Sequence, residues 1–330
     1  MKISEKAMLY RELAKLVGAD FHLDRSIQLL LGRNPSHARR TWLLGLQRGL
    51  AEGKSITEAL RTNCEAFTGT LELALIDAGE RSGRLNDGLS HLARYFEAWN
   101  IAVKQAIGAM IYPLLLAHMG IILPELPRLV TGSLEGGGYG LRGVFLPLAV
   151  LWLILLSSFL LWRWLSRLGA ESAAVDAWLA RVPFVGSVRR HWALARFSQV
   201  FHACLLASMR MTECMLLAGA ASHSGVLRRA AEGAAQRIAA GETIAGAMAD
   251  VHGFPLVFVH GTATAEEVGA LDREMNRWAA AESIEAADAV QRAALWLPKI
   301  AYAVVVLYVV SRIFGMVSGY MGGLQQLESF

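Results

Sequence analysis

Apolar residues recur at intervals of three and four along most of the chain, the spacing that brings them to one face of an α-helix. The stretches with this pattern are residues 5–18, 26–31, 36–52 and 67–97. Ser55 and Glu58 have the spacing of a capping box, in which each side chain bonds a free amide at the start of a helix. We find no alternation of apolar and polar residues with the period of two expected of a half-buried strand. The sequence therefore predicts an all-α protein.

The stretch 67–97 is predicted to fold as a hairpin of two amphipathic helices joined by a polar elbow. The elbow has the sequence AGERSGRL at residues 78–85. Gly83 can adopt the left-handed conformation that commonly ends a helix. Asn86 or Asp87 is expected to cap the start of the second helix. We therefore expect a short, charged turn that depends on glycine.

Three long apolar segments are predicted to cross a membrane: residues 106–127, 143–162 and 295–317. The second contains no charged residue and ends at Trp162, a residue type common at membrane interfaces. The first is interrupted by Pro113 and His118, so a buried helix of a soluble protein is the alternative interpretation of that segment. In the third, Lys299 and Arg312 lie near the ends, where long side chains can reach the interface.

The charges beside these segments predict their orientation. The flank after the second segment carries Arg163, Arg167, Arg181, Arg189 and Arg190, and positive flanks usually stay in the cytoplasm. We therefore expect a polytopic membrane protein with both large helical domains in the cytoplasm. Its expected parts are a first cytoplasmic bundle (1–105), a membrane helix (106–127), a short periplasmic loop (128–142), a second membrane helix (143–162), a second cytoplasmic bundle (163–294), a third membrane helix (295–317) and a periplasmic tail (318–330).

The second bundle is predicted to be a repeat of the first, because residues 195–317 reproduce the pattern of residues 7–130. The segment 52–56 matches 240–244 at an offset of 188 residues. Glu80, Gly83 and Leu85 match Glu266, Gly269 and Leu271 at an offset of 186 residues. In the second elbow, Ala265 and Val268 replace Gly79 and Ser82, so the two elbows are not expected to function identically.

Composition and charge exclude several classes of function. Hydrophobic residues make up 54% of the chain, as expected if apolar segments lie in a bilayer. The net charge is +4 and the basic residues are not concentrated in one block, which argues against a nucleic-acid-binding protein. Cys64, Cys204 and Cys214 lack the spacing of metal ligands and are interpreted as buried thiols. The glycines at 136–138 are not followed by the Lys-Ser/Thr of a phosphate-binding loop. We expect no catalytic, cofactor or metal site.

The elbow AGERSGRL, followed by Leu89, Leu92, Ala93 and Tyr95 in the pattern L-x-x-L-A-x-Y, resembles the signature of a known family. This family comprises the F proteins of type II secretion systems and the PilC-like inner-membrane platform proteins of type IV pili. The resemblance implies a non-enzymatic, multi-pass protein of the bacterial inner membrane. The partners it implies are a cytoplasmic hexameric assembly ATPase, pilin or pseudopilin subunits, other inner-membrane assembly proteins and further copies of the chain.

The candidate partner-binding residues lie in the two bundles. Guanidinium groups expected on the surface of the first bundle belong to Arg39, Arg40, Arg81, Arg84 and Arg94; a solvated face and a docking surface for an acidic partner are both open interpretations. Glu80, Glu266 and Glu267 are the acidic candidates of the elbows. Glu80 and Glu266 are interpreted as caps or ion-pair partners within each bundle, with partner contact as the alternative. Neither elbow brings a second group suited to acid–base catalysis at the same spacing in both repeats.

The candidate membrane-packing residues are Pro113, His118, Pro298, Gly315 and Gly319. For His118, a hydrogen bond between helices is favoured over a proton path, because no second ionisable group lies near it in this segment. Gly315 and Gly319 have the GxxxG spacing that permits close helix approach. Two other classes of protein remain open at this point: a membrane transporter subunit and a membrane-anchored signalling adaptor.

Overall fold

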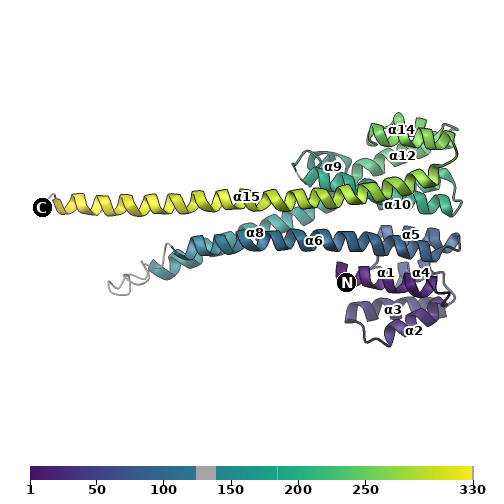
Figure 1. The fold of residues 1–330 in the computed structure, drawn as a ribbon, viewed down its shortest axis with the longest axis horizontal. Helices are drawn as coiled ribbons and strands as arrows, with labels where there is room; N and C mark the ends of the chain where they lie inside the picture. The colour runs from purple at the N-terminus through teal and green to yellow at the C-terminus, as the bar shows by residue number, and fades with distance from the viewer. Residues whose placement is uncertain (124–138, 184, 329–330) are drawn as a thin grey trace. The chain divides into compact units, whose positions relative to one another are not determined.

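The computed structural model describes residues 1–123, 139–183 and 185–328, and these residues form helices and no strand (Figure 1). The prediction of an all-α protein is therefore confirmed. The first bundle contains α1 (Ile3–Gly18), α2 (Leu23–Leu31), α3 (His37–Ala51), α4 (Ile56–Asn63), α5 (Thr70–Arg81) and the start of α6 (Leu85–Ile122). The remaining helices are α8 (Tyr139–Glu171), α9 (Ala173–Leu179), α10 (Val185–Leu206), α11 (Met211–Ala221), α12 (Gly225–Ala239), α13 (Ile244–Ala249), α14 (Leu256–Glu267) and α15 (Leu271–Glu328).

The chain divides into two compact units. The first unit contains residues 1–103 and 166–290, and the second contains residues 104–165 and 291–330. Both helical bundles therefore belong to the first unit. Helices α6, α8 and α15 each contribute residues to both units.

Aromatic side chains form the centre of each bundle. In the first bundle Tyr10 stacks on Phe96, with 5.7 Å between ring centroids, and meets Trp42 edge-on at 6.1 Å. In the second bundle Phe258 contacts Phe197 and Trp278 edge-on, with centroids 6.0 and 5.2 Å apart. Burial of such large apolar surfaces is the main favourable contribution to folding.

The predicted helices 5–18, 26–31 and 36–52 and the capping box agree with the structure. Helices α1, α2 and α3 cover the three predicted stretches within a few residues at each end. The capping box is confirmed, because the Glu58 amide donates to Ser55 Oγ at 3.1 Å and the Ser55 amide donates to Glu58 Oε2 at 3.3 Å. Cys64, Cys204 and Cys214 are free and buried, as predicted.

Two described helices are long and apolar enough to cross a membrane, Leu85–Ile122 and Val144–Glu171. They contain residues 106–122 of the first predicted span and all but the first residue of the second. The third predicted span, 295–317, lies within α15, but many of its side chains are outside the description, so this span stays a prediction. Helix α8 begins at Tyr139, inside the predicted loop 128–142, and α15 continues to Glu328 through the predicted tail. Residues 124–138, 184 and 329–330 are outside the described residues.

Candidate functional site

The first elbow is a tight turn between α5 and α6. Gly83 has a φ of +67°, the left-handed conformation that the sequence predicts for the end of α5. The Ser82 hydroxyl donates to the carbonyl oxygen of Ala78 at 2.7 Å. The expected cap by Asn86 or Asp87 is wrong, because α6 already begins at Leu85 and both residues lie in its first turn. Asp87 Oδ2 instead accepts from Arg84 Nε at 2.8 Å.

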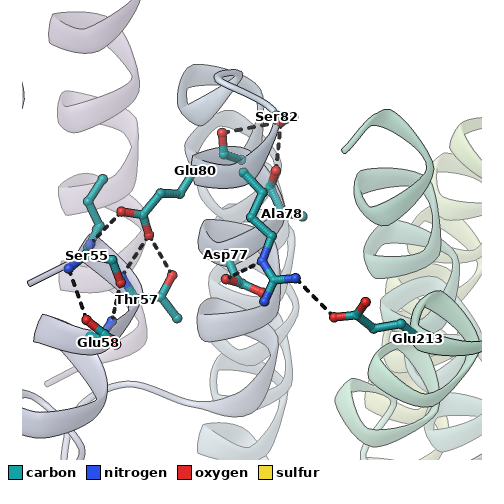
Figure 2. Close-up of polar contacts among 11 residues, drawn as sticks. Ser55, Thr57, Glu58, Asp77, Ala78, Glu80, Ser82 and Glu213 are labelled. Atoms are coloured by element: carbon teal, nitrogen blue, oxygen red, sulfur yellow. Dashed lines mark hydrogen bonds and ion pairs between the residues drawn. The ribbon is translucent and has the colours of Figure 1, made fainter. Parts of the chain in front are cut away.

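Glu80 joins the elbow to the start of α4. Its Oε1 accepts from the Ile56 amide at 2.7 Å, and its Oε2 accepts from the amide and the hydroxyl of Thr57 at 3.1 and 3.0 Å. Figure 2 shows the carboxylate of Glu80 pointing from α5 toward these first residues of α4. An anion at a helix start satisfies free amides and interacts favourably with the helix dipole.

Glu266 repeats this arrangement in the second bundle. Its Oε1 accepts from the Ile244 amide at 2.7 Å and its Oε2 from the Ala245 amide at 2.9 Å. Helix α13, which begins at Ile244, corresponds to α4 at the offset seen in the sequence. The cap interpretation of Glu80 and Glu266 therefore describes their contacts, whereas a role in partner binding stays a prediction.

The basic candidates of the first bundle differ in their surroundings. Arg81 donates through Nε to Asp77 Oδ1 and through Nη1 to Glu213 Oε1 of α11, both at 3.1 Å (Figure 2). Arg40, Arg84 and Arg94 are exposed. The expectation that Arg39 is exposed is wrong.

Arg39 is buried because its position in α3 faces the core. It lies three residues before Trp42 and four before Leu43, both fully buried, so the helical period brings it to the same face. Its guanidinium forms an ion pair with Glu12 of α1. A buried charge needs such a partner, so Arg39 connects α1 and α3 within the bundle.

The second elbow has a different surface chemistry. Gly269 has a φ of +66°, so the turn itself resembles the first. Glu267 stands at the position of Arg81 and is exposed. Val268 stands at the position of Ser82 and is 71% exposed. The repeat thus retains the backbone turn but replaces a cation by an anion.

A groove of about 590 Å³ lies between α1 and α6. Arg11, Lys15 and Gly18 of α1 and Asn86 and Arg94 of α6 are among the residues that line it. Arg11 also forms an ion pair with Glu97 on the same wall. The groove is an open, positively charged surface of the first bundle that sequence reasoning did not predict.

The two bundles also contact each other within the first unit, a feature missed at the sequence level. Helix α5 packs against α10 and α11. The ring of His91 on α6 lies edge-on to the ring of His202 on α10, with 5.5 Å between centroids. Burial, followed by the charge of Arg94, lowers the pKa of His91 to about 4, and burial lowers the pKa of His202. Further contacts join Tyr95 to Trp192, Tyr95 to Arg196, and Thr70 to His223.

The burial of α10 in the folded chain reflects this contact. A helix covered on one side should have a polar face, yet the residues from Trp192 to Cys204 include only one, Arg196, that is not buried. A helix buried all round must be covered by a second layer. That layer is the hairpin of the first bundle.

The structure describes the surroundings of only some of the membrane-packing candidates. Pro113 lies inside α6. His118 Nδ1 is 2.7 Å from the Leu114 carbonyl oxygen of its own helix, and its ring lies edge-on to Trp152 of α8 with centroids 5.9 Å apart. The expected hydrogen bond between helices is therefore replaced by a bond within the helix and a ring contact to the neighbouring one. Pro298, Gly315 and Gly319 lie in α15, in the part whose packing is outside the description.

Within the described part of the chain, no three His, Cys, Asp or Glu side chains are grouped so that they could hold a metal ion. The expectations that the protein has no metal, no cofactor and no catalytic site stay predictions.

Comparison with known proteins identifies relatives in two bacterial machines. The family model described as type II secretion system (T2SS), protein F matches residues 9–125 and again residues 197–319. Type II secretion system protein F of Aeromonas hydrophila is 26% identical over 298 residues, covering 83% of this chain and 74% of the relative. Type IV pilus assembly protein PilC of Pseudomonas aeruginosa is 23% identical over 308 residues, covering 88% and 82%. PilC of Thermus thermophilus is 25% identical over 295 residues, covering 83% and 71%. Because the family model matches well over half of the chain, this protein belongs to the type II secretion system protein F family.

Proposed function

We propose that this protein is a non-enzymatic inner-membrane platform of a type IV pilus or type II secretion assembly machine. Its first bundle engages a cytoplasmic hexameric assembly ATPase, and its membrane segments guide pilin or pseudopilin subunits out of the bilayer. Family membership supports this proposal, since the relatives are named for type II secretion and for type IV pilus assembly. The platform, with both bundles in the cytoplasm and three spans, also contacts other inner-membrane assembly proteins.

The observation that carries the coupling mechanism is the continuity of α6. This helix has 38 residues, from Leu85 at the elbow to Ile122 in the apolar segment. At 1.5 Å per residue it is about 57 Å long. A hydrogen-bonded helix resists bending, so a displacement imposed on its first turns is carried along the helix as far as Pro113, which lies inside its apolar part. In the proposed mechanism the ATPase moves the first bundle and α6 carries that motion into the membrane.

A helix break between the two units tests the coupling. Ile101 is half exposed and lies in α6 two residues before the end of the first unit. Ile101→Pro removes a helix hydrogen bond and kinks the helix at a cost of about 3 kcal/mol, without removing a core side chain. We expect normal amounts of protein in the membrane fraction but loss of pili, or of secretion, in cells that lack the wild-type copy. Ile101→Ala is the matched control and should retain assembly; full assembly by the proline variant would contradict the mechanism.

Charge reversals test where the ATPase docks. Full-length protein is co-purified with the assembly ATPase encoded by the same cell, and Arg84→Glu should reduce the amount retained. Arg81 also bonds Glu213 within the chain, so Arg81→Glu must be compared with a variant in which Glu213 is reversed as well. If Arg81 contacts the ATPase, Arg81→Glu/Glu213→Arg should lose the ATPase as completely as the single variant. Recovery in the double variant, together with normal retention by Arg84→Glu, would place docking away from the elbow.

A further inference from the structure

The two repeats expose different fractions of the same helix face. On α5, Leu71, Ala74 and Ala78 follow one another at helical spacing and are 4%, 7% and 1% exposed. Thr70 and Arg81 lie on this face as well, and they contact His223 and Glu213 of the second bundle. The face is therefore covered by α10 and α11 of the same chain.

The corresponding face of α14 is uncovered. At the offset of 186 residues, Leu71, Ala74 and Ala78 correspond to Val257, His260 and Thr264, and all three are exposed. Val257 is 71% exposed, and Leu256 beside it is 75% exposed. Neighbouring apolar side chains left in water on a helix of a folded domain commonly mark an interaction surface.

The reciprocal surface shows the same asymmetry. On α10, which packs against α5 of the first bundle, Gln199 and Ala203 are buried. At the offset of 188 residues they correspond to Arg11 and Lys15 of α1, both exposed. Met8, one turn earlier on the same face, is 54% exposed and corresponds to Arg196. In the second bundle, α10 and α11 are covered by α5 of the first bundle. The corresponding helices of the first bundle, α1 and α2, have no such covering helix among the described residues.

The ion pair between α5 and α11 indicates that the two uncovered faces, on α14 and on α1–α2, fit each other. Within the chain, Arg81 of α5 bonds Glu213 of α11 at 3.1 Å. The corresponding residues are Glu267 of α14 and Arg25 of α2, so the charges are exchanged but remain opposite. Both are exposed, and among the residues that the structure describes Arg25 makes only a long 3.4 Å contact to Gln28. The contact within the chain pairs a cation on α5 with an anion on α11. The corresponding positions carry an anion on α14 and a cation on α2, so the charges of the two uncovered faces are also complementary.

We propose that α14 of one copy packs on α1 and α2 of a second copy, reproducing between chains the contact that α5 makes with α10 and α11 within the chain. Glu267 of one copy then pairs with Arg25 of the other, and Val257 lies against the apolar part of the α1 face near Met8. The contact is heterologous, because it joins two different surfaces, and each copy keeps one of each kind for further neighbours.

Cross-linking between two differently tagged full-length chains tests the contact. One chain carries Arg25→Cys, the other carries Glu267→Cys, and both are expressed together and oxidised in membranes. We expect a disulfide-linked pair at least tenfold above that of Arg40→Cys with Glu267→Cys, because Arg40 is exposed but belongs to α3, which is not part of the proposed contact. The three native thiols are buried, and chains without added cysteines give the background.

Charge reversal provides the second test and separates the contact from damage to the fold. In purified full-length protein, Arg25→Glu or Glu267→Arg alone should weaken self-association about five- to tenfold, as expected of one exposed ion pair turned repulsive. Arg25→Glu/Glu267→Arg in the same chain should restore it to within about twofold. Cross-linking no greater than that of the control pair, or a double variant as weak as the single ones, would overturn the proposal.

Discussion

The carboxylates of Glu80 and Glu266 should stabilise separate parts of the protein, although they occupy the same place in each repeat. Glu80 accepts three hydrogen bonds at the start of α4, and Glu266 accepts two at the start of α13. We therefore consider Glu80→Ala and Glu266→Ala, which remove the acceptor and leave the helix amides to water.

The magnitude follows from the number of bonds lost. A hydrogen bond to a charged group contributes about 1.5–3 kcal/mol when buried, and both carboxylates are half buried, so we take about 1 kcal/mol for each bond. Glu80→Ala should then cost about 3 kcal/mol and Glu266→Ala about 2 kcal/mol. At 1.4 kcal/mol for each factor of ten, the open form of the affected bundle increases about 150-fold and about 30-fold.

Native thiols report this opening without any added label. Cys64 caps the end of α4 and is buried, and Cys204 and Cys214 are buried in the second bundle. Burial raises the pKa of Cys64 to about 11, so the folded protein should alkylate slowly at neutral pH and only through local opening. Labelling of intact protein in detergent, followed by mass analysis of each cysteine peptide, then measures the opening of each bundle.

The two variants should give opposite patterns. Glu80→Ala should accelerate labelling of Cys64 far more than that of Cys204 and Cys214, and Glu266→Ala should do the reverse. Glu267→Ala, which removes an exposed carboxylate beside the second cap, is the control and should change all rates by less than about threefold. Equal acceleration of all three thiols, or no acceleration of Cys64 by Glu80→Ala, would refute the assignment of separate caps.

Three further predictions concern buried groups. The pKa of His91 is lowered to about 4, below the unfolded value of about 6.5. The stability that neutral His91 contributes is therefore complete above pH 6.5 and is lost as the pH falls toward 4. In His91→Gln, the unfolding free energy measured in urea should depend less on pH over this range. Glu72 accepts from Lys6 Nζ and the Tyr10 hydroxyl, both at 2.6 Å, and Glu72→Gln should lower the unfolding free energy by about 3 kcal/mol, because it leaves a cation without its partner. Gly49→Ala would place a methyl group 2.3 Å from Ala59 Cβ and should lower the melting temperature, whereas Gly32→Ala meets only ordinary contacts and should not.

Local sequence signals predicted most of the first bundle because the relevant forces act within a few residues. The helices α1 to α3, the capping box and the left-handed Gly83 each depend on residues at most four positions apart. The burial of Arg39 followed from the same period, since it shares a face with Trp42, but adjacent arginines were interpreted together as a surface pair. The amphipathic period was a stronger guide here than residue type.

The parts that could not be predicted depend on contacts between distant segments. Glu80 reaches amides more than twenty residues earlier, and the sequence alone left its role open between a cap and a partner contact. Arg81 bonds a residue in the other repeat, 132 positions away. Nothing in the local pattern of either helix specifies such a partner, because many pairs of amphipathic faces are equally compatible before the chain is folded.

The repeat explains why one chain leaves two complementary faces uncovered. Each repeat carries two faces, one formed by the helix before the elbow (α5 or α14) and one formed by the first two helices (α1–α2 or α10–α11). Two repeats in one chain can form only one of the two possible contacts between such faces. In repeat proteins the terminal units usually carry polar outer faces that prevent further stacking. Here the α14 face has His260 and Thr264 in place of two buried alanines, yet it retains the exposed Leu256 and Val257. A face with a small apolar part among polar residues is unlike a terminal cap and typical of a surface that meets its partner after folding.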